Sequence, residues 1–511
     1  MIIWLIIIIL FQIRGNLTLD VYFLKEFGYE IIITTIYLIN FFAILNLLFR
    51  EKRGTETTIA WVMILVIIPA FGCILYLLVG RGVAKDNMFK IKEAEDKIIK
   101  KNILDTHVRL EYGDKLDPDI IEHKDMIYAL ANSNDANFTT NNDIDIYAEC
   151  NGFFDSLLEE LKKAKKYINI QFYIFKDDEI GNKIIDILLD KAKDGVEVRL
   201  LYDAVGSRLF SDKSIQKLKN SGIKTGAFFP SFMKIINFNL NYRNHRKIVV
   251  IDGETGFIGG NNIGDEYLGK DPKFGNWRDT HLKLTGDCVR DLNIRFVLDW
   301  RYTTKEDLDL NKYFNEKILS IRKKSNKNIG IQIVSSGPDI TDLDEIKYGY
   351  IKMIQKAKKY VYIQSPYFIL DSTLLETLKI SCLSGVDVRI MIPSKPDHPF
   401  VYWASCSYAG ELLKFGAKLY NYDENSFLHA KTIVIDDAIC SIGTANMDIR
   451  SFALNFEVNA FIYSSEIAKK QRLIFANDIL NSKEITNELY NSRSTSMRIK
   501  ESISRLLSPV L

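Results

Sequence analysis

The sequence predicts two α/β domains related by duplication, each a mixed sheet flanked by helices, behind an N-terminal transmembrane helical hairpin. Three observations predict this fold: two uncharged stretches near the N-terminus, short apolar runs alternating with amphipathic segments, and several segments that occur twice in the same order. A chain of 511 residues has room for two or three domains. Its net charge of +2 argues against a protein built to neutralise nucleic acid, so we expect no nucleic-acid partner.

Residues 1–82 are predicted to form a membrane anchor. Residues 31–49 and 57–79 carry no charge, and a helix as long as the first stretch would reach roughly 28 Å, enough to cross a bilayer. Pro69 in the second stretch predicts a kink. A further apolar segment, residues 2–13, is too short to span and lacks the flanks of a cleaved signal peptide, which leaves the number of spans open.

The distribution of basic residues favours a cytoplasmic main body. The predicted hairpin loop carries Arg50, Lys52 and Arg53. More basic residues follow the second span, namely Arg81, Lys85, Lys90, Lys92, Lys97, Lys100 and Lys101. The positive-inside rule therefore places the body in the cytoplasm. Six scattered cysteines without a CxxC pair agree with a reducing compartment and give no metal-ligand spacing.

Three pairs of segments show that the rest of the chain is duplicated. They are AKKYINIQFYIF at 164–175 with AKKYVYIQSPYF at 357–368, GVEVRLL at 195–201 with GVDVRIM at 385–391, and NHRKIVVIDG at 244–253 with LHAKTIVIDD at 428–437. β-branched runs predict strands, and the apolar residues before them recur at helical spacing. The predicted parts are a linker at 83–115, a first domain at 116–310, a linker at 311–335 and a second domain at 336–511.

Each copy carries a histidine, lysine, aspartate and asparagine at the same spacing. They are His245, Lys247, Asp252 and Asn262 in the first copy, and His429, Lys431, Asp436 and Asn446 in the second. Residues two apart on a strand project from one face, and the glycines before each asparagine allow a bound anion to approach the backbone. A cluster of imidazole, ammonium and amide donors suits a phosphate.

The doubled HxK(x)4D, followed by GxxN, resembles the signature of the phospholipase D superfamily, in which both copies form one active site that cleaves a phosphodiester without a metal. Other segments are similar to bacterial cardiolipin synthases along almost the whole chain. They are AWVMILVIIPAFGCILYLLVGRG, NWRDTHLKLTG, SPYFILD, KPDHPFVYWASCSYAGELL and GTANMDIRSFALNFEVNAF. GGNN departs from the pattern, because it has Gly260 where Ser or Thr is common.

The resemblance implies a role for each of these residues. One histidine attacks phosphorus and the other protonates the leaving glycerol; relatives favour His245 as nucleophile and His429 as acid, but the sequence leaves this assignment open. The two lysines, with Asn262 and Asn446, would hold the phosphoryl oxygens. Asp279 and Glu457 would each orient a histidine. Asp252 and Asp436 are as compatible with turn formation as with catalysis.

The implied function is cardiolipin synthesis at the bacterial cell membrane by a multi-pass protein. One phosphatidylglycerol would give its phosphatidyl group to another, with glycerol as the second product. The alternatives are a membrane-bound phospholipase D hydrolase and a transferase that uses another alcohol. No cofactor is expected, because exchange of one phosphodiester for another is close to energy-neutral and no nucleotide-binding loop is present. The oligomeric state stays open.

Three other features receive structural interpretations. His281 is predicted to be packed rather than catalytic. Residues 230–243 precede the first motif and contain an insertion of about ten residues relative to the second copy. An ordinary hairpin is slightly favoured there over a surface for acyl chains or the membrane. Ile499, Ile503 and Leu506 form one helical stripe near the C-terminus, which is predicted to pack on the protein body.

Overall fold

The computed structural model describes residues 17–49, 55–79, 118–134, 136–230, 242–306, 308, 313, 327, 329–338 and 344–508. The chain divides into two compact units, residues 1–85 and 86–509. The predicted segments 2–13 and 83–115, and most of the predicted linker 311–335 and of the insertion 230–243, lie outside the described residues.

In the part of the first unit that the structure describes, residues 17–49 and 55–79, one helix is long and apolar enough to cross a membrane. Its helices are α2 (Leu17–Phe49), α3 (Thr55–Ile67) and α4 (Pro69–Val79). Within α2, the segment Gly28–Phe49 has a mean hydropathy of 2.2 and is 11% buried. Low burial is what a lipid-facing helix requires, whereas a core helix would be covered by protein.

The second uncharged stretch is two short helices rather than one straight span. A bend at Ile68 separates α3 from α4, at the proline that the sequence predicted would kink the helix. The ring centroids of Trp61 and Tyr76 lie 5.6 Å apart, although a continuous helix would separate these residues by about 22 Å. α4 therefore folds back along α3. The side-chain amide of Asn40 in α2 donates to the main-chain oxygens of Leu65 and Pro69 at this bend.

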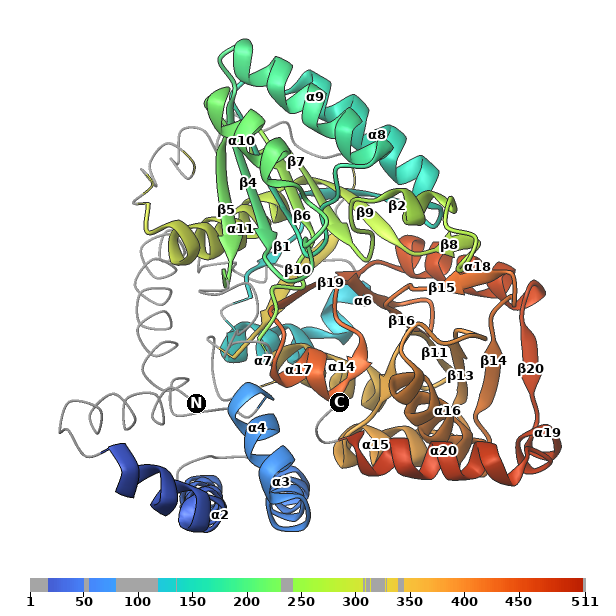
Figure 1. Cartoon of the computed structure of the whole chain (residues 1–511). Coiled ribbons are helices and arrows are strands. Elements are labelled where there is room, and N and C mark those ends of the chain that lie inside the picture. Colours follow the sequence, from blue (N-terminus) through green and yellow to red (C-terminus); the bar gives the residue numbers. More distant parts are fainter. Residues whose placement is uncertain are drawn as a thin grey trace. The chain divides into compact units, whose positions relative to one another are not determined.

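The first half of the second unit is a seven-stranded mixed sheet in the order β2-β9-β7-β6-β3-β4-β5 (Figure 1). β3, β4 and β5 run parallel, and the remaining pairs are antiparallel. The strands of this sheet are β2 (Asn142–Tyr147), β3 (Tyr167–Phe172), β4 (Glu197–Asp203), β5 (Lys224–Phe228), β6 (Ile248–Ile251), β7 (Thr255–Gly259) and β9 (His281–Gly286), and a further strand, β8 (Asn276–Arg278), lies outside it. The helices are α8 (Cys150–Lys163), α9 (Glu179–Lys193), α10 (Asp212–Asn220), the 3₁₀ helix η1 (Asp265–Leu268) and α11 (Cys288–Thr304).

The second half repeats this sheet and extends it at both edges. Its order is β1-β10-β19-β17-β16-β11-β13-β14-β20. The strands of this sheet are β1 (Phe138–Thr139), β10 (Gly330–Ser336), β11 (Tyr360–Gln364), β13 (Asp387–Ile392), β14 (Lys418–Asn421), β16 (Thr432–Ile435), β17 (Ile439–Gly443), β19 (Glu457–Tyr463) and β20 (Lys483–Ile485). Outside it, β12 (Phe368–Ile369) pairs with β18 (Met447–Asp448), and β15 (Ser426–Leu428) pairs with β8. The helices are α6 (Pro118–Glu122), α7 (Lys124–Asn134), α14 (Glu345–Lys356), α15 (Ser372–Leu383), α16 (Pro399–Leu413), α17 (Ile449–Ala453), α18 (Ser465–Leu480), α19 (Asn487–Asn491) and α20 (Thr495–Leu506).

The repeated sequence segments form equivalent strands in the two sheets. The AKKY segments lead into β3 and β11, the GVEV and GVDV segments into β4 and β13, and the histidine motifs into β6 and β16. In both sheets the order around these strands is the same. The predicted duplication of a mixed α/β domain is thus confirmed.

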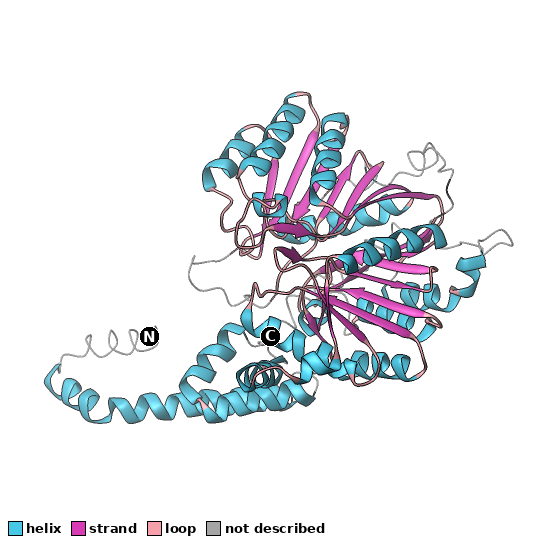
Figure 2. Ribbon diagram, turned by 90° about the vertical axis from the view of Figure 1, so that its right-hand side faces the viewer, coloured by secondary structure: helices cyan, strands magenta, loops and turns pink. Residues whose placement is uncertain are grey.

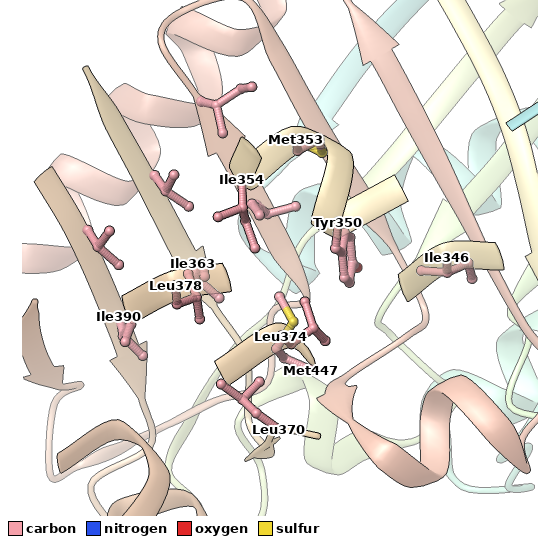
Figure 3. Packing of buried hydrophobic residues seen from close by; sticks show 14 of the residues in the cluster. Ile346, Tyr350, Met353, Ile354, Ile363, Leu370, Leu374, Leu378, Ile390 and Met447 are labelled. Carbon is pink, nitrogen blue, oxygen red and sulfur yellow. The ribbon is translucent and has the colours of Figure 1, made fainter. Parts of the chain in front are cut away.

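Each sheet lies between layers of helices (Figure 2), and buried apolar residues pack between the layers. In the second half, α14 and α15 supply Tyr350, Met353, Leu374 and Leu378 to a cluster on one face, as Figure 3 shows. A separate cluster on the other face joins the two halves, because it contains residues of β6, β9 and α11 together with residues of β16, β19 and α18. The halves therefore share a continuous core.

Residues 118–139 come before the first half in the chain but pack with the second. β1 pairs with β10, and Ile120, Met126 and Phe138 belong to the apolar cluster of the second sheet. The predicted first domain, which begins at residue 116, thus includes a segment whose packing is provided by the second half. The other domain bounds stay a prediction.

Candidate active site

Each motif histidine is held against a strand segment of the opposite half. The main-chain N–H of His429 donates to the oxygen of Arg278 at 2.7 Å, where β15 runs parallel to β8. In the same way, the N–H of His245 donates to the oxygen of Phe456 at 3.0 Å, beside a parallel bridge between Asn244 and Phe456. The next residue after Arg278 is Asp279, and the next after Phe456 is Glu457. Both main-chain contacts between the halves thus place a carboxylate next to a histidine.

The two carboxylates are exchanged between the halves. Nδ1 of His245 lies 3.0 Å from both carboxylate oxygens of Glu457, and Nδ1 of His429 lies 2.6 Å from Oδ2 of Asp279. When the carboxylate is ionised, Nδ1–H donates to it and Nε2 carries the lone pair. The sequence predicted that these residues meet the histidines. The sequence did not indicate that each carboxylate would contact the histidine of the other copy.

Both orienting carboxylates are fully buried and ionised. Burial opposes the charge of Asp279, but Lys431 and His429 outweigh it and hold the pKa of Asp279 below its usual value. Burial likewise opposes the charge of Glu457, while His245 and Lys247 lower its pKa. Neutral pH therefore leaves a fixed acceptor behind each imidazole.

The motif lysines lie beside their histidines. Nζ of Lys247 donates to the main-chain oxygen of His245 at 2.7 Å. Nζ of Lys431 donates to the main-chain oxygen of His429 and also lies 2.7 Å from its Nδ1. Burial lowers the pKa of Lys247 well below its usual value, and burial lowers that of Lys431 to about 8. Lys431 remains mostly protonated at pH 7.

The charged groups of each motif act on the histidine of the other motif. Burial is the main cause that lowers the pKa of both, and that of His429 falls to about 4. The charge of Lys431 in the second half also lowers the pKa of His245, and the charge of Lys247 in the first half lowers that of His429. Without a bound anion both imidazoles are neutral at pH 7.

The two motif asparagines have different surroundings. Asn262 accepts from the N–H of Ile174 at 3.1 Å and donates to the hydroxyl of Tyr267 at 2.9 Å, which leaves one amide hydrogen for a ligand. The side-chain oxygen of Asn446 is buried without a hydrogen-bond partner. A buried amide oxygen without a hydrogen-bond partner costs free energy unless a ligand or a water molecule donates to it. The side chain of Asn446 is therefore freer than that of Asn262 to bind a ligand or water.

The motif aspartates lie at the far ends of their strands from the histidines. Asp252 accepts from the main-chain N–H groups of Lys165, Lys166 and Tyr167 at 2.7–2.9 Å. Asp436 accepts from Lys358, Lys359 and Tyr360 at 2.6–2.9 Å. Both have positive φ, 55° and 53°, as the turn after each strand requires. Of the two roles left open by the sequence, these contacts favour the turn-forming role over catalysis, because each carboxylate holds the repeated AKKY segment.

Two buried ion pairs behind the site were missed by sequence reasoning. Arg246, between the motif His and Lys, binds Asp299 with 2.8 and 2.7 Å contacts and donates to the main-chain oxygen of Glu457. Arg278, just before Asp279, binds Asp478 at 3.1 and 2.8 Å.

Two equivalent glutamines donate to the acids of these ion pairs. Their matching places in the repeated segments are the sequence signal that could have indicated the ion pairs. Gln171 donates to Asp299 and Gln364 to Asp478, at 2.9 and 2.7 Å. Both glutamines stand at the same place in the repeated segments.

Two aromatic contacts complete the surroundings. The ring of Tyr173 meets that of His245 edge-on at 5.0 Å, and Nζ of Lys247 lies 5.5 Å from the Tyr173 ring centre. His281 stacks on Phe153 at 3.9 Å, and burial lowers its pKa to about 3. This packing agrees with the structural interpretation of His281. No group of three or more potential metal ligands occurs in the part of the chain that the structure describes.

Comparison with known proteins shows to which family the chain belongs. Residues 157–271 and 350–479 match the family described as cardiolipin synthase, phospholipase D-like domain, and residues 38–81 match the phospholipase D-nuclease N-terminal family. The major cardiolipin synthase ClsA of Bacillus subtilis strain 168 is 47% identical over 487 residues, which cover 94% of this chain and 99% of that protein. The chain belongs to the cardiolipin synthase family. The cardiolipin synthase of Clostridium perfringens strain 13 is 49% identical over 90% of this chain and 95% of that protein.

The fold also has a solved counterpart. The crystal structure of phosphatidylserine synthase from Haemophilus influenzae matches with a TM-score of 0.55 and 16% identity, over 76% of this chain and all of that chain. At this identity the likeness shows the fold alone. The two stretches that match the cardiolipin synthase domain contain His245 and His429 with their lysines and asparagines, whereas Asp279 lies just outside the first stretch.

Proposed function

We propose that this protein is a cardiolipin synthase that transfers the phosphatidyl group of one phosphatidylglycerol to a hydroxyl of another. The observation that carries the proposal is the exchanged pair of contacts, His245 with Glu457 and His429 with Asp279. They give two oriented imidazoles, each with a buried lysine, in one site. Such a site can attack phosphorus, protonate a leaving alkoxide and stabilise the phosphoryl oxygens.

In the first step, Nε2 of neutral His245 attacks phosphorus and forms an N–P bond. Its lowered pKa keeps the lone pair available at neutral pH, and Glu457 stabilises the imidazolium that forms. The P–O bond to glycerol breaks, and protonated His429 gives its Nε2 proton to the departing oxygen. His429 becomes protonated when the substrate binds, because the negative charge of the phosphodiester raises the pKa of His429 from about 4.

In the second step, His429, now neutral, removes a proton from the hydroxyl of the second phosphatidylglycerol. The resulting oxygen attacks phosphorus, the N–P bond breaks and cardiolipin leaves. Lys247 and Lys431 hold the non-bridging oxygens in both steps, together with side-chain amide N–H groups of Asn262 and Asn446, because phosphoryl oxygens accept hydrogen bonds. One phosphodiester bond is made for each one broken, so the proposal requires no cofactor.

We place the enzyme in the bacterial cell membrane, anchored by Gly28–Phe49, with its catalytic body in the cytoplasm. The basic residues after residue 80 and the six unpaired cysteines support this orientation. The multi-pass topology predicted from sequence would require α3 and α4 to straighten into one span. Phospholipid is the expected partner of this body.

The test is the lipid product formed by the purified full chain in vesicles that contain phosphatidylglycerol alone. We expect cardiolipin and glycerol in equal amounts, and no product from His245→Ala or His429→Ala. Phosphatidic acid as the main product would identify water as the acceptor and the protein as a phospholipase D. Product formed only after phosphatidylethanolamine is added would identify a different acceptor.

A further inference from the structure

The C-terminal helix α20 turns its apolar side outward and its polar side inward. Ile499, Ile503 and Leu506 lie on one stripe and are 53%, 49% and 76% exposed. On the opposite side, Glu501 and Ser504 are 3% and 1% exposed. The prediction that the apolar stripe packs on the body is therefore wrong. A surface helix normally shows the reverse arrangement.

Polar and cation–π contacts attach α20 to the body. Glu501 accepts from Nε of Arg493 at 3.1 and 2.9 Å and from the hydroxyl of Tyr490 at 3.3 Å. Arg505 pairs with Glu411 of α16 at 2.5 Å and lies 4.3 Å from the ring centre of Tyr408. The fold thus holds the helix without its apolar side, and that side is left for another partner.

Positive charges border the exposed stripe. Arg498 and Lys500 are neighbours of Ile499, and Nζ of Lys500 lies 5.2 Å from the ring centre of Trp403. A cavity of about 370 Å³ beside the helix is lined by Lys414 and Arg498 among other residues. The nearby acids, Glu411 and Glu501, are already paired with Arg505 and Arg493. Within the described part of the chain, Lys414, Arg498 and Lys500 have no ion-pair partner.

This combination identifies the chemistry of the partner. An apolar helix side bordered by cations matches a phospholipid surface with anionic headgroups, into which apolar side chains insert while Lys and Arg meet phosphates. A second copy of the chain fits less well, because a twofold contact through this face would bring the same cations together.

The helix is also connected to the active site. α20 packs on α16, and Asp397, two residues before α16, is among the charges that act on Lys431. Phe400 in the first turn of α16 is 53% exposed. A lipid surface in contact with α20 would therefore fix the orientation of the helix that borders the catalytic centre.

We propose that the outward side of α20 is a docking surface for anionic phospholipid, a second membrane contact of the catalytic body besides the N-terminal helices. The inference rests on the proposed function only in taking phosphatidylglycerol as the anionic lipid. Docking would keep the active site at the headgroup level, where both substrates lie.

The decisive measurement is the depth of a spin label on α20 in the full chain. Cysteine would replace Ile503 in a background where the half-buried Cys382 and Cys406 are alanine, and the protein would be placed in phosphatidylglycerol vesicles. We expect greater access of oxygen than of a water-soluble nickel complex, which indicates lipid. Leu473→Cys is the matched control, because Leu473 is 58% exposed on α18, on the other face of the sheet, and should stay in water.

The other results would overturn the proposal. Water-like access at residue 503 would show that α20 does not dock, and low access to both reagents would show that protein covers it, either a second copy or the N-terminal helices. Equal depth in phosphatidylcholine vesicles would remove the anionic requirement. These readings do not depend on catalysis, so a protein that makes phosphatidic acid could still dock, and an active cardiolipin synthase could fail to.

A kinetic measurement supplies a second test. Arg498→Gln and Lys500→Gln should each raise the phosphatidylglycerol mole fraction needed for half-maximal rate about fivefold, with little change in maximal rate. Ile499→Ser combined with Ile503→Ser should act in the same direction. Leu473→Ser should change neither constant. A fall in maximal rate without a change in lipid dependence would contradict a docking role.

Discussion

In both halves the motif lysine donates to the main-chain oxygen of its histidine, but the imidazoles have different partners. His245 contacts a glutamate, whereas His429 contacts a shorter aspartate, and its Nδ1 also lies 2.7 Å from Nζ of Lys431. The shorter carboxylate fits because residue 260 is glycine, since a Cβ there would lie 2.0 Å from Oδ1 of Asp279. The equivalent residue near Glu457 is Thr444. The comparison teaches that one duplicated scaffold gives its two histidines different electrostatic surroundings.

The halves also differ in how they neutralise equivalent buried acids. Asp299 is bound by Arg246 of its own motif, whereas the residue equivalent to Arg246 in the second motif is Ala430. Asp478 is bound instead by Arg278 of the first half. Each arginine also donates to the main chain around a carboxylate, at Glu457 and Asp279 respectively. The first half therefore supplies the buried cation behind both histidines, and neither half could keep its site alone.

The largest expected effect separates the histidines. His245→Asn and His429→Asn should each lower turnover of phosphatidylglycerol by at least about 10⁴-fold, because each removes a reacting group. A substrate with p-nitrophenol in place of glycerol needs no acid to leave. With it, His429→Asn should release one equivalent of nitrophenol and retain a phosphatidyl adduct on His245, measured by mass spectrometry.

The matched variant gives the opposite result. His245→Asn should release no nitrophenol and carry no adduct. An adduct on His429 in that variant would show that His429 is the nucleophile and His245 the acid, with the same geometry of the site.

The exchanged carboxylates should give the next largest effect. Glu457→Gln and Asp279→Asn should lower turnover by about 10²- to 10⁴-fold, because the amide no longer fixes the imidazole tautomer. Glu457→Gln should also remove the nitrophenol burst, since it acts on His245. Asp279→Asn should keep the burst and lose turnover, since it acts on His429. If Asp279→Asn removed the nitrophenol burst and Glu457→Gln kept it, each carboxylate would act on the histidine of its own half, and the exchanged contacts would have no part in catalysis.

The lysines should produce a moderate pH effect. The pKa of Lys431 is lowered to about 8 by burial, against the charges of Asp279, Glu457, Asp397 and Asp448, so its positive charge is lost above that pH. We expect kcat/KM to fall about tenfold per pH unit above this value.

Two variants assign this alkaline fall to one half. It should disappear in Lys431→Arg, whose guanidinium stays charged, and persist in Lys247→Arg. The acid side should fall through a pKa below 6.5, because protonation of His245 removes the lone pair. An unchanged alkaline fall in Lys431→Arg would assign it to the first half.

Much of the fold could be predicted because it depends on local patterns. β-branched runs such as IVVI and TIVI form strands β6 and β16, and repeated segments in fixed order determine equivalent strands. The residues of the site could be predicted for the same reason, since equal spacing on equivalent strands brings equivalent side chains together.

The partners of those residues could not be predicted, because they depend on how the halves pack. Nothing near Asp279 in sequence indicates that it contacts His429 rather than His245. Arg246 lies between two motif positions, and its contact with Asp299 depends on where α11 packs. The outward stripe of α20 has the spacing of a core-facing helix, and only the burial of Glu501 on its other side shows which face is inside.

The smallest effect on chemistry is expected where the halves are alike. Asp252 and Asp436 each accept three main-chain N–H groups, and asparagine tolerates positive φ better than other residues, so Asp→Asn removes charge with little strain. Each variant should lose about 1–3 kcal/mol of unfolding free energy, seen as a lower Tm, while kcat of the folded protein changes less than about twofold. Asp190→Asn, which removes only an exposed ion pair, should leave Tm unchanged. Loss of kcat at unchanged Tm in either motif variant would instead show that this aspartate takes part in catalysis. Such a loss in only one of the two variants would show that the halves also differ at the strand ends that lie far from the histidines.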